Sequence, residues 1–380
     1  METGKAADGI APSPVTAMAK PAFPGYPCPM TRQDHAPMTP PETPRAAGFT
    51  MPAEWAPHAR TWMMWPCRAE VWDDMEATRR NYAEVAHAIR ESEPVTMLVR
   101  PQDEAGARAL LGSDIDLLPH PIDDSWARDA GPCFLTDATG HRAGTSFRFN
   151  AWGGKYTPFD GDDSASDAIL SAAGVRAFTS DLIAEGGGIT TDGEGTIITT
   201  LSCFPNANRN PGWTLDQLET ELKEMLGAEK VIWLPGNVEE TETDGHVDGI
   251  AMFLAPGLLM VQGNDRPDHP WRHIHAANLE ALDGQTDAKG RPLKLVHCPD
   301  AFDYDTDSDN FCDSYVNAYI CNGAVIVPRY NLPEDGRVRE LFEEHLPNHR
   351  VRMVDITTLA TGGGGIHCIT QQEPATPRNF

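Results

Sequence analysis

Apolar and polar residues alternate along the chain from Phe49 onward in a pattern that predicts helices and strands in turn. The clearest helical stretch runs from Val71 to Glu91, and a short apolar strand follows it from Val95 to Val99. Further helices are predicted at 103–111, 163–173, 215–226, 271–282 and 335–345. Such a mixture of helices and strands is typical of an α/β protein.

β-Hairpins are predicted between these helices. Three β-rich runs reverse at Asp192-Gly193, Pro256-Gly257 and Asn322-Gly323, and such residue pairs favour tight turns. The turns are 64 and 66 residues apart, and a near-constant interval indicates internal repetition. A hairpin at 133–150 and a predicted strand that carries Cys368 extend the series to five units.

Each unit opens with a polar motif. The motifs lie at 124–129 (DSWARD), 185–188 (EGGG), 244–248 (DGHVD), 313–317 (DSYVN) and 362–368 (GGGGIHC). If the five units surround an axis, their equivalent strand ends converge on it. We therefore predict one fivefold α/β domain with its chemistry at the centre.

The beginning of the chain has a different composition. Residues 1–48 contain ten prolines and few large apolar side chains, too few to offset the entropy lost on ordering. We predict that residues 1–48 are disordered or loosely attached and that residues 49–380 form the catalytic domain. The segment lacks the continuous apolar stretch of a signal peptide, so we do not expect it to direct export.

Charge and cysteine usage limit the partners. Among 380 residues, 56 acidic residues stand against 30 Lys and Arg, which gives a formal net charge of −26. Such a field repels phosphate backbones, so no nucleic acid partner is expected, and the acidity also serves solubility. Eight scattered cysteines without a C-x-x-C pair favour reduced thiols and a cytoplasmic location. No apolar run approaches the roughly 18 residues that cross a bilayer, so no membrane partner is expected.

Cys368 is the candidate nucleophile. An isolated cysteine is usually a buried apolar residue, but the preceding glycines, Gly362 to Gly365, permit unusual backbone angles and close approach of a ligand. His246 and Asp248 would share one face of an extended segment. A thiol, a histidine that moves protons and a carboxylate that binds a cation suit covalent catalysis on a cationic substrate.

A zinc site at His246 and Asp248 is the competing interpretation. It needs further ligands, and His367, next to Cys368, should point to the opposite side of an extended strand. We therefore predict no metal.

Two more acidic residues are candidates with two interpretations each. Asp129 either pairs with Arg128 or combines with Trp126 into a carboxylate and a flat apolar wall, which suits a planar guanidinium. Glu185 precedes three glycines and is either a surface charge at a strand end or the acceptor that orients His246.

Eight stretches between residues 51 and 374, taken in order, resemble the agmatine deiminases and bacterial-type peptidylarginine deiminases of the guanidino-group-modifying superfamily. They are 51–55 (MPAEW), 62–66 (WMMWP), 124–132 (DSWARDAGP), 149–154 (FNAWGG), 185–187 (EGG), 208–211 (NRNP), 242–248 (ETDGHVD) and 366–372 (IHCITQQ). The chain has glycine at position 365, where agmatine deiminases commonly carry Asn, and at position 188, where Ser is frequent. These differences bear on the choice of guanidine more than on the chemistry.

The resemblance implies a five-bladed α/β propeller, or pentein, in a single domain, and it assigns roles by position. Cys368 would be the nucleophile, His246 the general acid and base, Asp129 and Asp248 the guanidinium ligands, and Glu185 the support for His246. Trp126 would line the pocket, and Glu242 would lie near the distal amine of agmatine.

The resemblance also implies a reaction. Agmatine and water would give N-carbamoylputrescine and ammonia through a thiouronium intermediate, a step of polyamine biosynthesis toward putrescine, without metal or organic cofactor. The alternatives are a deiminase of peptidyl-arginine or another guanidine with the same site, an amidinotransferase, or a non-catalytic guanidine-binding protein. The expected partner is a small cationic guanidine, and a homodimer is the assembly that we consider.

Overall fold

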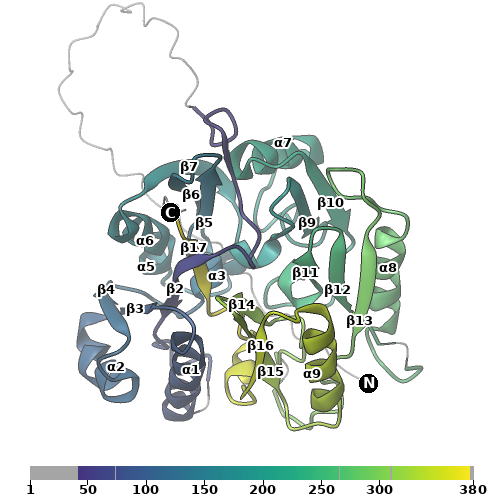
Figure 1. The fold of residues 1–380 in the computed structure, drawn as a ribbon. Coiled ribbons are helices and arrows are strands. Elements are labelled where there is room, and N and C mark those ends of the chain that lie inside the picture. Colours follow the sequence, from purple (N-terminus) through teal and green to yellow (C-terminus); the bar gives the residue numbers. More distant parts are fainter. Residues whose placement is uncertain (1–41, 73, 265, 309, 377–380) are drawn as a thin grey trace, which may run out of the picture. The chain divides into compact units, whose positions relative to one another are not determined.

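Five small sheets make up the described part of the protein, which comprises residues 42–376 apart from 73, 265 and 309 in a computed structural model. Figure 1 shows the sheets following one another around a common centre. Each contains an antiparallel pair of strands and a third strand, parallel to the second, that is reached through a helical segment. This repeated arrangement confirms the predicted fivefold α/β class.

The first four sheets follow the order of the chain. The first contains β1 (Phe49–Thr50), β5 (Cys133–Asp137), β6 (Arg142–Arg148) and β7 (Arg176–Ile183), and the second β8 (Thr190–Thr191), β9 (Thr196–Thr200) and β10 (Lys230–Leu234). The third contains β11 (Ala251–Ala255), β12 (Leu258–Gln262) and β13 (Lys294–Cys298), and the fourth β14 (Tyr319–Cys321), β15 (Ala324–Arg329) and β16 (Arg350–Asp355).

The fifth sheet joins the two ends of the described chain. Its order is β17 (Gln371–Pro374), β2 (His58–Met64), β3 (Val95–Val99) and β4 (Asp116–Pro119). Strand β17 pairs antiparallel with β2, about 310 positions earlier in the sequence, as the register of Gln371 opposite Trp62 shows. This pairing closes the ring of sheets.

The helices lie in the connections. The six predicted helices correspond to α1 (Met75–Arg90), α2 (Glu104–Leu111), α6 (Ala165–Ala173), α7 (Leu215–Leu226), α8 (Arg272–Leu282) and α9 (Glu334–His345), which confirms them. Helix α1 begins later than predicted because the Asp74 side chain accepts the backbone N–H of Ala77 and caps the first turn. Short helices α4 (Ala151–Gly154) and α5 (Asp160–Asp163) precede α6, so the predicted helix at 163–173 starts only at Ala165.

Helix α7 illustrates how the sequence sets an element. Thr214 and Gln217 form a capping box at its start, and Gly227, with φ of +64°, ends it in the left-handed conformation. The buried residues Leu218 and Leu222 lie one turn apart and face a core that the first and second sheets share.

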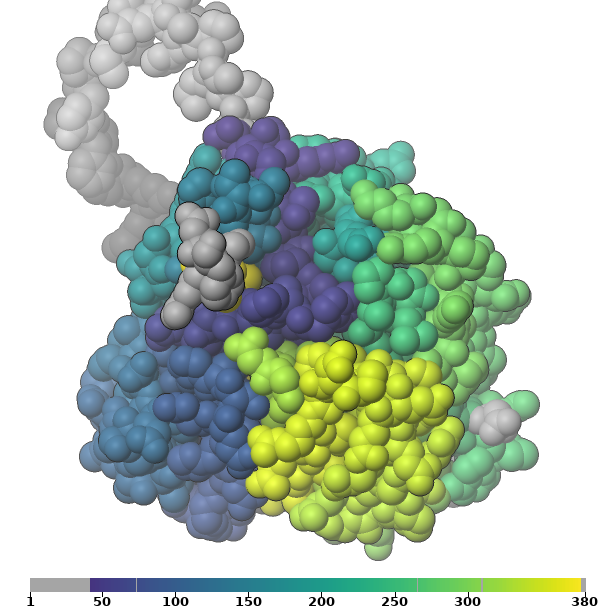
Figure 2. Space-filling model, in the orientation of Figure 1, coloured from purple at the N-terminus to yellow at the C-terminus, as the bar shows by residue number. Residues whose placement is uncertain are grey.

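The predicted N-terminal segment lies outside the described residues from position 1 to 41. Its remainder, residues 42–48, contacts α7, where the Thr43 hydroxyl donates to Glu224 Oε2 at 2.7 Å. Figure 2 shows the first described residues, in purple, crossing the middle of the face that is turned toward the reader. None of the helices in the described part of the chain has the length and apolar character needed to span a bilayer.

Candidate active site

The segments that precede the first strands of the five units meet at the centre. They are α3 (Ala127–Ala130), η2 (Gly186–Gly188), η3 (Val247–Gly249), the loop 313–317 and the turn 363–370. The Gly187 N–H donates to Asp129 Oδ1 at 3.0 Å, and Asn317 Nδ2 donates to Cys368 Sγ at 3.1 Å. The structure thus brings the five predicted polar motifs together.

Cys368 lies in a turn and not in a strand, so the prediction of a strand at this position was wrong. The glycine-rich stretch after η4 (Leu359–Gly362) folds into turns, and β17 begins only at Gln371. The Sγ atom lies 3.5 Å from Asp248 Oδ2 and 3.1 Å from Asn317 Nδ2. Burial, followed by the charges of Asp248 and Asp129, raises the pKa of the thiol well above its usual range.

The prediction that His246 and Asp248 share a face of an extended segment was also wrong. Val247 opens the 3-10 turn η3, and the strand β11 begins only at Ala251. His246 nevertheless reaches the centre, with Nδ1 3.7 Å from Asp129 Oδ1 and Nε2 3.5 Å from Glu185 Oε2. Burial lowers the pKa of His246, but the neighbouring negative charges, Asp129 first, outweigh burial and raise it well above the usual value. The ring is therefore an imidazolium, able to donate a proton.

Asp129 pairs with neither Arg128 nor another arginine among the described residues. Its Oδ2 accepts from Trp152 Nε1 at 2.9 Å, and its Oδ1 accepts from the Gly187 amide. Burial, opposed by His246 and assisted by Asp248, raises the pKa of Asp129 to about 6. At neutral pH this carboxylate is ionised and fixed by two donors, as a guanidinium ligand requires.

The backbone of Gly187 borders the polar centre directly. A Cβ atom at this position would lie 2.6 Å from both Asp129 Oδ1 and His246 Nδ1, and 3.1 Å from Asp248 Oδ2. All three functional groups therefore converge around a site that only glycine can occupy. The triple glycine after Glu185 was noted in the sequence, but its role as a contact surface was not.

Glu185 is held by a cation that the sequence analysis did not assign. Arg209 Nε donates to Glu185 Oε1 at 2.7 Å, and Arg209 Nη1 donates to Asp244 Oδ2 at 2.6 Å. Burial acts against ionisation of Glu185, but Arg209 and then His246 outweigh it and lower its pKa. Glu185 thus stays anionic beside His246, although at 3.5 Å the contact is electrostatic rather than a hydrogen bond. The NRNP motif was the signal that could have identified Arg209.

His367 points toward the centre, contrary to the prediction, because the turn at Cys368 removes the alternation of a strand. Its Nδ1 lies 2.8 Å from Asp248 Oδ2, and its Nε2 lies 2.9 Å from Glu54 Oε2. Burial disfavours the ionised form of Asp248, but the hydrogen bond and charge of His367 outweigh burial and lower the pKa of that carboxyl.

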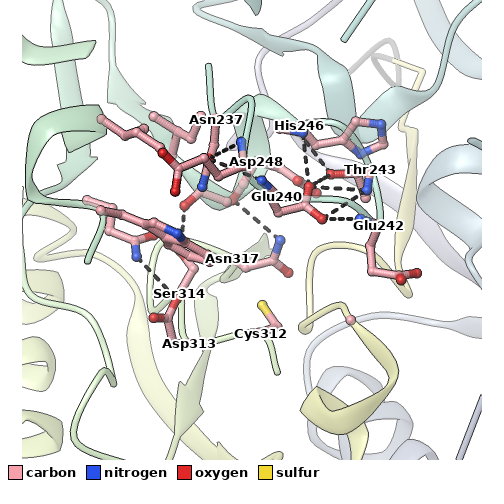
Figure 3. Close-up of a pocket in the computed structure, with 18 of the residues that line it drawn as sticks. Asn237, Glu240, Glu242, Thr243, His246, Asp248, Cys312, Asp313, Ser314 and Asn317 are labelled. Carbon is pink, nitrogen blue, oxygen red and sulfur yellow. Dashed lines mark hydrogen bonds between the residues drawn. The ribbon is translucent and has the colours of Figure 1, made fainter. Parts of the chain in front are cut away.

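Two cavities reach the thiol. The larger, of about 940 Å³ including the space open to solvent, is lined by His246, Asp248, Asn317, Glu242 and Cys368 among others, and Figure 3 shows most of its polar lining. The smaller is lined by Trp126, Asp129, Tyr156, Glu242 and Cys368. Glu242 and Cys368 border both cavities, so an elongated cation can extend from the thiol to Glu242.

The remaining predicted residues lie in the wall of the smaller cavity. Trp126 packs against Trp72 with ring centroids 5.6 Å apart and forms a flat apolar surface. Glu242 accepts hydrogen bonds from the Tyr156 hydroxyl and from Asn310 Nδ2, both at 2.6 Å. These donors fix the position of the carboxylate at the cavity wall.

Two sets of side chains in the described residues have the proximity that a metal ion requires. The first, Glu185, Cys203 and His246, is an unsuitable site because Arg209 already donates to Glu185 and its cation would repel a metal. The second is His269, His275 and Asp300.

In this second set, the backbone amides of Trp271 and Asn264 donate to Nδ1 of His269 and His275. That arrangement leaves the ring proton on Nε2, whereas a metal-bound histidine usually donates from its other nitrogen. Neither set fits a metal.

Residues 50–374 match the family model of the Porphyromonas-type peptidyl-arginine deiminases. The chain belongs to this family. Among its relatives is the agmatine deiminase of Ectopseudomonas mendocina (strain ymp), 39% identical over 358 residues that cover 88% of this chain and 97% of that protein. The agmatine deiminase of Pseudomonas aeruginosa (strain LESB58) is also 39% identical, over 361 residues that cover 88% of this chain and 98% of the relative.

A solved structure of a family member has the same fold. The agmatine deiminase of Enterococcus faecalis superposes with a TM-score of 0.86 at 33% sequence identity, over 89% of this chain and 99% of that chain. The similarity therefore extends over the whole ring of sheets and includes the central segments.

Proposed function

We propose that the protein hydrolyses the guanidinium group of agmatine to give N-carbamoylputrescine and ammonia. The observation that carries the proposal is the convergence of Cys368, His246, Asp129 and Asp248 on one buried point, with Asp129 held by the Gly187 amide. Relatives of about 40% identity that carry the name agmatine deiminase, matched over nearly their entire length, support the same reaction.

The two positive groups of agmatine match the carboxylates that line the two cavities, which supports one orientation of the substrate. The guanidinium lies between Asp129 and Asp248, which accept its N–H groups in charge-assisted hydrogen bonds. The aliphatic stem passes the apolar face of Trp126, and the distal ammonium binds Glu242 at the cavity wall. Glu242 keeps its position because Tyr156 and Asn310 hold its two oxygens.

In the first step the Cys368 thiolate attacks the central guanidinium carbon, and a C–S bond forms. The bound guanidinium offsets the two carboxylates that disfavour the thiolate, so the substrate itself promotes ionisation of the thiol, whose proton passes to solvent. The His246 imidazolium then donates its proton to the departing amino group, the C–N bond breaks, and ammonia leaves. A thiouronium adduct on Cys368 remains.

In the second step neutral His246 accepts a proton from water, which attacks the carbon of the adduct. The C–S bond breaks, the sulfur leaves as thiolate and takes up the second proton of the attacking water, which restores the thiol, and the urea product N-carbamoylputrescine is released. Glu185 stabilises the imidazolium whenever it forms, because its own charge is held by Arg209.

Ammonia release from four substrates tests the proposal. The purified protein is incubated side by side with agmatine, free arginine, a peptidyl-arginine and a methylated arginine. We expect agmatine to have the highest kcat/KM. A preference for the peptide would make the protein a peptidyl-arginine deiminase, and transfer of the amidino group to an added amine would make it a transferase.

We also propose that the enzyme works in the cytoplasm, since the seven cysteines among the described residues are all free thiols and disulfides are rare there. The proposed partners are the guanidine substrate and, for assembly, a second copy of the chain. Light scattering of the full chain measures that assembly.

A further inference from the structure

His367 lies between two buried carboxylates. Its Nδ1 is 2.8 Å from Asp248 Oδ2, and its Nε2 is 2.9 Å from Glu54 Oε2. The other oxygen of Glu54 accepts the backbone N–H of Ile320 at 2.7 Å, which fixes that carboxylate behind the ring. Glu54 lies in the segment between β1 and β2.

Both ring nitrogens of His367 therefore face acceptor atoms. A neutral imidazole carries one N–H and could satisfy only one of the carboxylates, while its lone pair would face the other. An imidazolium donates to both. The geometry thus favours the charged ring, provided that Asp248 and Glu54 both remain ionised.

The surrounding charges keep both carboxylates ionised. Although burial opposes it, the pKa of Glu54 is lowered by His367 and by Arg128, whose Nη2 lies 3.6 Å from Glu54 Oε2. The backbone of His367 is held by neutral and cationic groups: its N–H donates to the Asn317 side-chain oxygen at 2.9 Å, and its carbonyl accepts from Arg128 Nε at 3.4 Å and from the Thr370 hydroxyl at 3.1 Å. Burial and Arg128 lower the pKa of His367, but Glu54 and Asp248 outweigh them and raise it.

The charges at the centre balance only with a protonated His367. The carboxylates are Glu54, Asp129, Glu185, Asp248 and Asp244, and the cations are Arg128, Arg209, His246, His367 and Lys155, the last of which pairs with Asp244. Loss of the His367 charge would leave one buried carboxylate without compensation. Such a carboxylate takes up a proton at a higher pH than a paired one does.

We propose that His367 is a positioning residue that stays an imidazolium throughout the reaction and keeps Asp248 ionised and oriented toward the guanidinium. Asp248 Oδ2 is directed at His367 and Cys368, and no described residue makes a hydrogen bond to Oδ1, which is left for the substrate. The effect on turnover rests on the proposed function, whereas the protonation of the ring is a property of the free protein.

The protonation state is measured directly by nitrogen NMR. The full chain is labelled with ¹⁵N in its histidine rings, and the His367 signals are assigned by their loss in His367→Gln. We expect both ring nitrogens to be protonated from pH 6 to 8 without substrate. A His367 with one protonated nitrogen at pH 7 overturns the proposal, whatever substrate the enzyme uses.

A Glu54→Gln variant provides the second measurement. Removing this carboxylate leaves the hydrogen bond to Asp248 but takes away half of the negative charge that faces the ring. The pH at which His367 loses its proton should fall by about one unit or more. An unchanged midpoint would show that Glu54 does not hold the charge. If His367→Gln fails to fold, His367→Asn serves to assign the signals.

Kinetics of His367→Gln complete the test. With the cation gone, the pKa of Asp248 rises, so the acid limb of kcat/KM for agmatine should move up by about one pH unit, and KM should rise more than kcat falls. His269→Gln, a buried histidine 3.3 Å from Asp300 and outside the centre, is the matched control and should leave the limb in place. The positioning role of His367 would be rejected if the acid limb moved equally in both variants, or if it did not move in a folded His367→Gln.

Discussion

At the residue scale, the thiol of Cys368 is expected to be protonated until substrate binds, because burial, Asp248 and Asp129 all oppose the thiolate. Iodoacetamide should therefore alkylate the free enzyme slowly at pH 7 and faster as pH rises beyond the ordinary thiol pKa of about 8.5. A small amidine alkylating reagent should react disproportionately fast, since it supplies the missing cation.

Rates of inactivation against pH for the two reagents check this expectation. Cys368→Ser is the control: it should remain folded, lose nearly all turnover and lose the rapid reaction with the amidine reagent. Mapping the labelled peptide separates Cys368 from Cys312, which also lines the larger cavity. A pKa of Cys368 well below 7 in the free enzyme would contradict the substrate-assisted mechanism.

Glu242→Gln should narrow the preference for agmatine over arginine. The carboxylate, held by Tyr156 and Asn310, attracts a distal ammonium and repels the carboxylate of arginine. Losing one charge-assisted hydrogen bond costs roughly 1.5–3 kcal/mol, so kcat/KM for agmatine should fall about tenfold or more. The ratio of kcat/KM for the two substrates is the measurement, and an unchanged ratio would place the amine elsewhere.

The side chains that meet at the centre were easier to predict from the sequence than the residues that hold them in position. Cys368 was identifiable because four glycines precede it, and His246 and Asp248 because a histidine and a carboxylate stand two positions apart, although the extended segment expected for them was wrong. Arg209 and Asn317 act through other side chains, and their partners lie far away in the sequence: Arg209 meets Glu185, and Asn317 meets Cys368. Nothing in local spacing reveals such pairs.

At the element scale, the site lies on short turns, and η2 borders it directly. Gly187→Ala should abolish turnover, because its Cβ would lie 2.6 Å from Asp129 Oδ1 and His246 Nδ1 and must displace one of them. We expect kcat/KM for agmatine to fall by about 100-fold or more, the effect of misplacing catalytic groups by an ångström.

Gly106→Ala in helix α2 is the control for Gly187→Ala, since a Cβ there meets nothing within 4 Å. It should retain full activity. Circular dichroism establishes that both variants are folded. If a folded Gly187→Ala turned over agmatine at a near-normal rate, the observed positions of the Asp129 carboxylate and the His246 ring would not be required for catalysis.

Elements with strong local signals were predicted well. The capped helix α7 and the hairpin turns at Gly193, Gly257 and Gly323, which all have positive φ, have causes within a few residues. The third strands β10, β13 and β16 were not predicted. They pair in parallel with β9, β12 and β15, and a helix lies between the paired strands in the sequence. No hairpin turn in the sequence therefore indicates where these strands are.

At the scale of the whole molecule, the constant interval between hairpins predicted five units, but it could not predict how the ring closes. Closure depends on the pairing of β17 with β2, two strands from opposite ends of the described chain. The same β17 directly follows the turn that holds Cys368. Closing the ring and positioning the nucleophile are therefore physically linked.

Glu373 is the polar connection at this closure and is almost completely buried, with 3% exposure. Its Oε2 accepts from Trp62 Nε1 of β2 at 2.9 Å, its Oε1 pairs with Arg142 of β6, and Arg60 lies 3.6 Å away. Removing Glu373 leaves the buried Trp62 Nε1 without its acceptor, at a cost of about 1–3 kcal/mol, whereas Arg142 and Arg60 are partly exposed and can be hydrated.

Glu373→Ala should therefore lower the free energy of unfolding by about 1–3 kcal/mol, measured by urea denaturation of the full chain. The free energy of unfolding of Glu373→Gln should lie between those of Glu373→Ala and the unmodified chain. Its amide oxygen still accepts from Trp62 but offsets the charge of neither arginine. Glu343→Ala, which removes an exposed carboxylate 4.0 Å from Arg339 on α9, should change stability by less than about 0.5 kcal/mol. If Glu373→Ala unfolds at the same urea concentration as the unmodified chain, closure of the ring depends on the backbone pairing of β17 alone, and the charged network contributes nothing.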